Sequence, residues 1–260
     1  MSKIKISLDP GHGGKDRANK GPTGYIEADG VLDISLKLKA ELLSTGAFEV
    51  MLTREKDMTL GVRERGQMAA KWGANMFISE HSNATGEEVN TNVRGVHVYT
   101  SVDLKDIDFA KQVADAVAAV MGNKGLACQR ESEIYPGEDY YGVIDSAQDG
   151  GVSHVLLIEN GFHDNALDEA ILKDPAKRLL IAKAQAKKIC EFYKVAYPAG
   201  IKTPEPDKIT VKLNGQVIKT TVDPVIIDGR TMICARDLAD ALGLEIGWEA
   251  ATRTVSLSKK

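Results

Sequence analysis

The sequence Lys3-Ile-Lys-Ile-Ser-Leu-Asp-Pro-Gly-His-Gly-Gly14 decides the architecture of this protein. Its first six residues alternate polar and apolar side chains, so that Ile4, Ile6 and Leu8 share one face, as in a β-strand. The pattern then breaks at a glycine-rich turn that contains His12. A strand that ends in a polar turn is typical of an open α/β sheet, in which sites form at the carboxyl ends of strands.

Strand-like and helical patterns alternate outward from this stretch, up to about residue 196. Further strands are predicted at residues 48–53, 76–80, 95–100 and 154–158. Helices are predicted at residues 31–44, 62–72, 104–121 and 175–193, and a long loop at 122–142. Such alternation favours an α/β domain built around a largely parallel or mixed sheet.

The pattern of the sequence changes after residue 196, which indicates a second domain. Residues 197–206 contain three prolines and a glycine, and we predict a semi-rigid linker there. Residues 207–260 carry short alternating segments, a strong hairpin signal at Asn214-Gly215 and one short helical segment. We therefore expect an N-terminal domain over residues 1–196 and a small α+β module over 207–260.

The composition excludes several classes of protein. The chain has 33 basic and 37 acidic residues in 260, and this balance argues against a nucleic-acid partner. No apolar run reaches the ~18–20 residues that a membrane-spanning helix needs, and no signal peptide is visible. Its three cysteines are too few and too widely spaced for a disulfide framework or a zinc knuckle.

Polar side chains lie at the ends of three predicted strands. His12, His81 and Glu159 occupy these ends, and Glu27 follows His12 by 15 residues. Two imidazoles and one carboxylate suit a catalytic zinc that keeps one position for water, and a further acid can move protons. Histidines also occur at strand ends of α/β proteins without a metal, so spacing alone leaves a structural role open.

A longer ordered pattern resembles the zinc-dependent N-acetylmuramoyl-L-alanine amidase family of the amidase-3 type. It spans residues 3–193 and consists of Ser7-Leu-Asp-Pro-Gly-His-Gly-Gly14, Glu27, Leu52-Thr-Arg54, Arg63-Glu-Arg65, Ser79-Glu-His-Ser-Asn83, Leu157-Ile-Glu-Asn-Gly-Phe162 and Asn165. The resemblance implies a twisted mixed β-sheet flanked by helices. It also implies that His12, Glu27 and His81 bind Zn²⁺ and that Glu159 is the catalytic acid and base.

The reaction implied by this resemblance is hydrolysis of the amide bond between N-acetylmuramic acid and L-alanine in peptidoglycan. Asn83 lies two residues after His81 and is a candidate for substrate binding. Other readings remain: a non-catalytic wall-binding protein, or another zinc hydrolase such as a peptidase or deacetylase. Without a visible signal peptide, we expect a phage endolysin or mother-cell lysin acting on the wall, or a secreted autolysin whose leader is absent from this sequence.

Three positions merit separate expectations. Glu80 and His163 stand where the family usually has apolar or aliphatic residues. On a strand, Glu80 should point away from His81, although it remains a rival ligand, and we expect His163 at the cleft rim or in solvent. His97 is expected to be structural or at the edge of the cleft.

The tail resembles the copper amine oxidase N-terminal-like domain, also called a stalk domain. The matching residues are Val211-Lys-Leu-Asn-Gly215, Asp228-Gly-Arg-Thr231, Ala235-Arg-Asp-Leu238, Ala241-Leu-Gly243, Trp248 and Thr254-Val-Ser-Leu257. The segment has no histidine, so copper binding is not implied. In a protein that acts on cell walls, its position suggests a wall-binding or dimerising module, with a spacer as the alternative.

Overall fold

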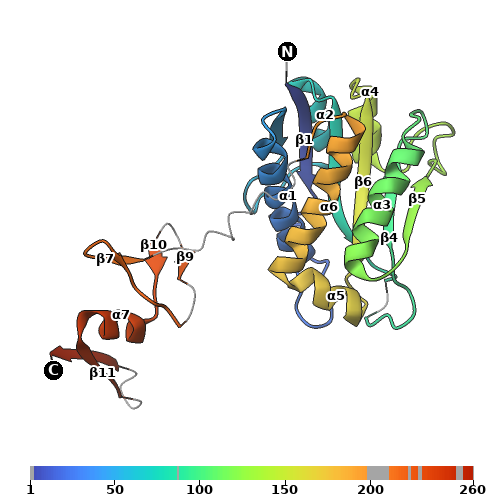
Figure 1. Ribbon diagram of the computed structural model, residues 1–260. Coiled ribbons are helices and arrows are strands. Elements are labelled where there is room, and N and C mark those ends of the chain that lie inside the picture. The colour runs from blue at the N-terminus through green and yellow to red at the C-terminus, as the bar shows by residue number, and fades with distance from the viewer. Residues whose placement is uncertain are drawn as a thin grey trace. The chain divides into compact units, whose positions relative to one another are not determined.

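A computed structural model describes residues 3–86, 88–197, 211–221, 224–227, 230–249 and 254–259. The chain divides into two compact units, Met1–Tyr197 and Pro198–Lys260 (Figure 1). Of the predicted linker at 197–206, all but Tyr197 lies outside the described residues. Among the described helices, none is both long enough and apolar enough to cross a membrane.

The first unit is built on a mixed six-stranded sheet with the order β2-β1-β3-β6-β4-β5. The strands are β1 (Ile4–Pro10), β2 (Phe48–Leu52), β3 (Met76–Asn83), β4 (Val96–Thr100), β5 (Gly125–Gln129) and β6 (His154–Phe162). Strands β2, β1, β3 and β6 run parallel, β4 is antiparallel to β6, and β5 is parallel to β4. The expected α/β class and mixed sheet are therefore confirmed.

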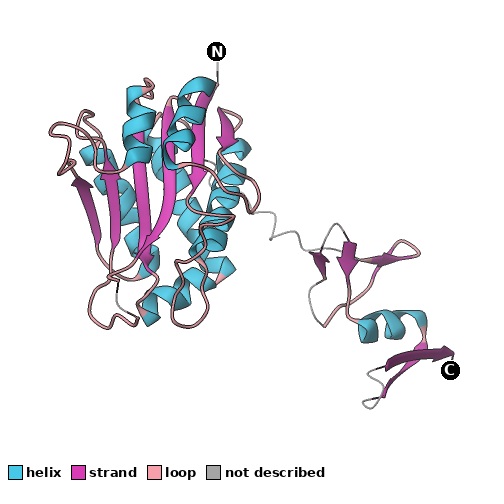
Figure 2. Ribbon diagram, turned by 180° about the vertical axis from the view of Figure 1, so that it is seen from behind, coloured by secondary structure: helices cyan, strands magenta, loops and turns pink. Residues whose placement is uncertain are grey.

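Helices cover both faces of this sheet. On the face toward the viewer in Figure 1 lie α1 (Glu27–Ser44), α3 (Ile107–Met121) and α6 (Pro175–Phe192). Figure 2 shows the other face, which carries α2 (Val62–Trp72) and α4 (Gly142–Asp149). The predicted stripe of Val31, Ile34, Leu38 and Leu42 is fully buried, because α1 packs its apolar side on the sheet.

Three elements differ from the sequence prediction. The segment 122–142, predicted as a loop, contains β5, and α4 and α5 (Ala166–Lys173) were not predicted. Strand β5 depends on its pairing with β4, which local alternation does not reveal. Helix α5 buries Asp168 and Glu169 beside Leu172, so it lacks the apolar stripe by which a helix is recognised.

The second unit consists of short strands and one helix, as expected for a small α+β module. It contains β7 (Lys212–Leu213), β8 (Gln216–Val217), β9 (Val225–Ile227), β10 (Arg230–Met232), α7 (Ala235–Leu242), β11 (Leu244–Glu249) and β12 (Thr254–Lys259). The Asn214-Gly215 turn joins β7 to β8, with positive φ at both residues, as a tight hairpin requires.

Candidate metal centre and active site

The turn after β1 holds His12 in an uncommon backbone conformation. His12 has φ 58°, in the left-handed region, and Gly13 and Gly14 follow with φ 111° and 62°. Gly11 is required for a different reason, because a β-carbon there would lie 2.3 Å from Cε1 of His81. The glycines therefore let the turn bring the two imidazole rings together, with 4.9 Å between their centroids.

Two buried arginines fix this turn through its backbone carbonyl groups. Arg54 donates to the carbonyl oxygens of Pro10 and Gly11 at 2.8 and 2.7 Å. Arg65 donates to the carbonyl oxygen of His12 at 2.8 Å and pairs with the buried carboxylate of Asp9 at 2.9 Å. The strain of the turn is thus opposed by a rigid set of hydrogen bonds.

Glu27 begins α1 and meets both histidines. Its Oε1 atom lies 3.3 Å from Nε2 of His12 and 3.2 Å from Nδ1 of His81, and it accepts a hydrogen bond from the backbone N–H of Ser82 at 2.8 Å. One nitrogen of each ring thus faces the same carboxylate oxygen. Because the carboxylate lies in the first turn of α1, the helix dipole also favours its negative charge.

Neighbouring side chains orient these groups. Nδ1 of His12 lies 2.8 Å from Oδ2 of Asp16, and this contact leaves Nε2 turned toward Glu27. Asn19 donates to Oε2 of Glu27 at 2.9 Å. Neither Asp16 nor Asn19 is among the residues predicted from the sequence, although a carboxylate four residues after a glycine-flanked histidine is a usable signal.

The electrostatics of the three groups are strongly coupled. Burial lowers the pKa of His12, but the carboxylates of Glu27 and Asp16 outweigh it and raise the pKa to about 9. Burial raises the pKa of Glu27, but hydrogen bonds and charge from both histidines bring it below its ordinary value. Burial also lowers the pKa of His81, and hydrogen bonding and charge from Glu27 again outweigh it. A metal that binds these rings would compete with their protons.

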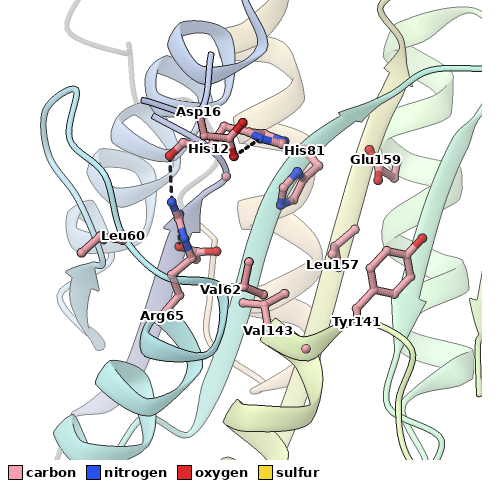
Figure 3. A pocket seen from close by; sticks show the side chains of 13 residues that line it. His12, Asp16, Leu60, Val62, Arg65, His81, Tyr141, Val143, Leu157 and Glu159 are labelled. Carbon is pink, nitrogen blue, oxygen red and sulfur yellow. Dashed lines mark hydrogen bonds and ion pairs between the residues drawn. The ribbon is translucent and has the colours of Figure 1, made fainter. Parts of the chain in front are cut away.

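Glu159 faces the same pocket from β6, directly opposite His81 in the pairing of β3 with β6. Burial raises the pKa of its carboxyl group to about 7, although the charge of His81 opposes this shift. Among the described residues its Oε2 atom has no hydrogen-bond partner. Figure 3 shows the carboxyl group beside His81, across the pocket from Asp16 and Arg65.

The pocket has a polar end and an apolar end. It is lined by Asp9, Gly11, His12, Asp16, Leu60, Val62, Arg65, His81, Tyr141, Gly142, Val143, Leu157 and Glu159. The apolar side chains are Leu60 and Val62, just before and at the beginning of α2, Val143 at the beginning of α4, and Leu157 of β6 (Figure 3). The sequence places Tyr141 with Tyr135 and Tyr140 on a loop whose rings could stack on sugar or peptide or have no role, and of these three only Tyr141 lines the described pocket.

Two further candidates do not line the pocket, although Nδ1 of His163 lies 3.9 Å from Oε2 of Glu27. Asn83 does not line the described pocket, and its Oδ1 accepts from the backbone N–H of Ala84. His163 is 4 % exposed, with Nδ1 2.9 Å from the carbonyl oxygen of Ser82, so its expected position at the rim is wrong. The reason is its surroundings, because the ring lies between Ser82 at the end of β3 and the buried ring of Tyr25, 6.3 Å away, and local sequence patterns do not reveal such contacts.

Glu80 points to the opposite side of the sheet, as the strand alternation predicts. Its Oε2 atom accepts hydrogen bonds from Asn160 at 2.6 Å and from Gln185 of α6 at 3.2 Å. All three side chains are fully buried. Glu80 is therefore not part of the group formed by His12, Glu27 and His81.

Comparison with known proteins decides the family. The family model described as N-acetylmuramoyl-L-alanine amidase matches residues 6–191.

The chain belongs to the N-acetylmuramoyl-L-alanine amidase family.

Two curated relatives of this amidase cover most of its length. The endolysin of Bacillus phage SPP1 is 30% identical over 215 residues, which cover 80% of this chain and 72% of that protein. N-acetylmuramoyl-L-alanine amidase CwlM of Bacillus licheniformis is 27% identical over 194 residues, 74% of this chain and 70% of CwlM. Relatives of the amidase thus include a phage endolysin and a bacterial N-acetylmuramoyl-L-alanine amidase.

The fold agrees with solved amidases. The catalytic domain of CwlV, an N-acetylmuramoyl-L-alanine amidase from Bacillus (Paenibacillus) polymyxa var. colistinus, matches with a TM-score of 0.62 and 26% identity. The match covers 74% of this chain and 99% of that domain. Residues 204–260 match the model of the copper amine oxidase N-terminal domain, in agreement with the resemblance of the tail.

Proposed function

We propose that this amidase cleaves the bond between N-acetylmuramic acid and L-alanine with a Zn²⁺ ion held by His12, Glu27 and His81. The observation that carries this proposal is the convergence of both imidazoles on one carboxylate. Ligand atoms of the three residues lie within 4.8 Å of one another, beside an acid with an unpartnered oxygen. Two nitrogen donors and one carboxylate fit zinc in a catalytic site and leave a position for water.

Bound zinc would lower the pKa of water and stabilise the negative charge that develops on the attacked carbonyl oxygen. Glu159 supplies the proton transfers, because its raised pKa of about 7 suits a group that both accepts and donates near neutral pH. It accepts a proton from the attacking water and returns it to the departing amine of L-alanine. Asp16 orients His12, and the two arginines hold the turn that carries it.

Digestion of purified peptidoglycan tests this function. The zinc-loaded full chain should release material with new L-alanine amino termini, identified by mass spectrometry. Release of acetate instead would indicate a deacetylase, and new amino termini at other residues would indicate a peptidase. Stoichiometric zinc with no soluble product would favour a wall-binding protein without catalysis.

We propose that the second unit binds the cell wall. Its described surface exposes large apolar side chains, with Trp248 and Val217 61% and 63% exposed. Trp248 is paired across β11 and β12 with Val255, which is 49% exposed, and adjoining exposed apolar side chains mark interaction surfaces. The full chain should sediment with purified walls more completely than a chain ending at Tyr197, at equal zinc content. Equal sedimentation, or dimerisation lost with the second unit, would favour a spacer or assembly role.

A further inference from the structure

The face of the sheet that carries His81 and Glu159 continues onto the neighbouring strands β4 and β5. In the pairing of β4 with β6, His97 lies directly opposite Glu159, and in the pairing of β4 with β5 it lies opposite Leu126. Side chains opposite one another on neighbouring strands share a face, so these residues extend the face that carries His81 and Glu159.

This part of the sheet is accessible from the side of the active site. Helix α3 packs against β4 and β5 from the opposite side, where Val96 and Val98 are buried. The accessible side looks toward the viewer at the edge of the sheet in Figure 2. There His97 and Tyr99 are half-buried, and Leu126 is 48% exposed.

Aromatic rings form a continuous path over this face. The ring of Tyr141, which lines the catalytic pocket, lies 4.8 Å from that of Tyr99 and 5.0 Å from that of Tyr140. The ring of Tyr99 is followed by that of His97 at 6.4 Å. The guanidinium of Arg130 lies 3.4 Å over the ring of Tyr140 and holds it in place. We call His97, Tyr99, Tyr140 and Tyr141 the aromatic strip.

We propose that the aromatic strip binds the glycan strand of the substrate next to the bond that is cut. This inference rests on the proposed function and names the part of peptidoglycan that lies on the β4 side of Glu159. Carbon-bound hydrogens on one face of a sugar ring pack well on the negatively charged face of an aromatic ring. The tyrosine hydroxyl groups and the imidazole can bind sugar hydroxyl and acetamido groups at the same time.

The charges around the strip favour glycan over stem peptide. Glu131, Glu133 and Glu138 are exposed on the loop that leads to Tyr140. Stem peptides carry carboxylates, which these side chains would repel, whereas the sugars of the glycan carry no charge apart from their lactyl attachment. Arg130 is the only basic side chain in the described segment 125–142, and it is engaged with Tyr140 and Glu133.

Binding of a neutral N-acetylated sugar chain tests the proposal directly. We suggest titrating the zinc-loaded full chain carrying Glu159→Gln with N-acetylglucosamine tetramer. Histidine-selective NMR reads only the first unit, because all five histidines precede residue 198. The signals of His97 should shift while those of His154 stay constant. Adding Tyr140→Ala should weaken this binding about tenfold, as expected for the loss of one aromatic contact.

Tyr135→Ala is the matched control, because Tyr135 lies on the same loop, is 65% exposed and is not part of the strip. It should leave the affinity for the tetramer unchanged. An absence of His97 shifts, or equal weakening by both substitutions, would overturn the proposal. A change of oligomeric state in Tyr140→Ala with unchanged sugar affinity would assign the strip to a second copy of the chain.

Turnover distinguishes this inference from the proposed function. Two substrates with the same scissile bond and stem peptide, one with a disaccharide and one with a tetrasaccharide, should differ in KM in the wild type. Tyr140→Ala should raise KM more for the tetrasaccharide than for the disaccharide and so reduce that difference. If neither substrate is cleaved but the tetramer still binds at His97, the proposed function fails and the glycan site stands. If Tyr140→Ala instead raises KM only with longer stem peptides, the strip binds peptide and the proposal fails.

Discussion

The two sides of the β3–β6 pair place similar carboxyl groups in very different surroundings. Glu159 faces the pocket with His81, whereas Glu80 faces α6 among Asn160 and Gln185. Burial raises the pKa of both to about 7, and for Glu80 the hydrogen bonds of the two amides oppose that rise. A raised pKa therefore does not by itself identify a candidate catalytic acid. What distinguishes Glu159 from Glu80 is that its carboxyl group faces the pocket and the two histidines.

The largest effect is expected at the metal ligands. His81→Ala should reduce zinc from about one ion per chain to a small fraction and abolish hydrolysis, because one of three protein ligands is lost. Zinc is measured by mass spectrometry after exhaustive dialysis. His97→Gln is the control for zinc content, since His97 is on the same face one strand beyond Glu159. Unchanged zinc in His81→Ala would show that another ligand set binds the ion.

The next largest effect is expected on kcat and distinguishes Glu159 from Glu80. Glu159→Gln should lower kcat by about 10²–10⁴, the usual contribution of general acid–base catalysis, while zinc content stays the same. Glu80→Gln should keep kcat within about threefold, because its side chain does not reach the pocket. Rates are compared on soluble muropeptides at equal zinc loading. An equal fall in kcat in both variants would contradict the assignment of catalysis to Glu159 and not to Glu80.

A stability effect is expected on the α6 side alone. Gln185→Leu removes hydrogen bonds to Oε2 of Glu80 and to Oδ1 of Asn160, at 3.2 and 3.0 Å. Leaving these buried groups without a donor should lower the free energy of unfolding by about 1–3 kcal/mol. The kcat of the folded enzyme should change little. Urea denaturation measures the first quantity, and a large fall in kcat without loss of stability would connect this network to catalysis.

The last prediction concerns a gain in stability that depends on pH, in contrast to the loss expected for Gln185→Leu. Because burial raises the pKa of Glu80 from 4.5 to about 7, the wild type loses stability as pH rises through this interval. Glu80→Gln carries no charge and should be more stable than the wild type by about 1–3 kcal/mol above pH 7. The difference should shrink toward pH 4.5. Paired urea melts at pH 5 and pH 8 check it, and a gain that is equal at both pH values would contradict this assignment.

The central strands and the residues that converge in the pocket could be predicted from the sequence, whereas most of the side chains around them could not. His12 follows β1, and His81 and Glu159 lie near the carboxyl ends of β3 and β6. These three strands run parallel, so the edge at which the residues meet follows from local alternation. The partner of Glu80 could not be found in this way, because Gln185 lies 105 residues away on a helix whose rotation is set by packing. Helix α4, which begins directly after Tyr141, was missed for a related reason, since it is short and forms against α2.

The hydrogen bonds that Arg54 and Arg65 donate to the histidine turn have a consequence for how this protein folds and acquires its metal. In a zinc finger, metal binding provides the free energy of folding, and the metal-free chain is unfolded. Here the carbonyl groups of the histidine turn are already bound by the guanidinium groups of Arg54, in the loop after β2, and of Arg65 in α2. We therefore expect folding and metal acquisition to be separate events. Such a chain can reach its compact state in a zinc-poor environment and become active only where zinc is supplied.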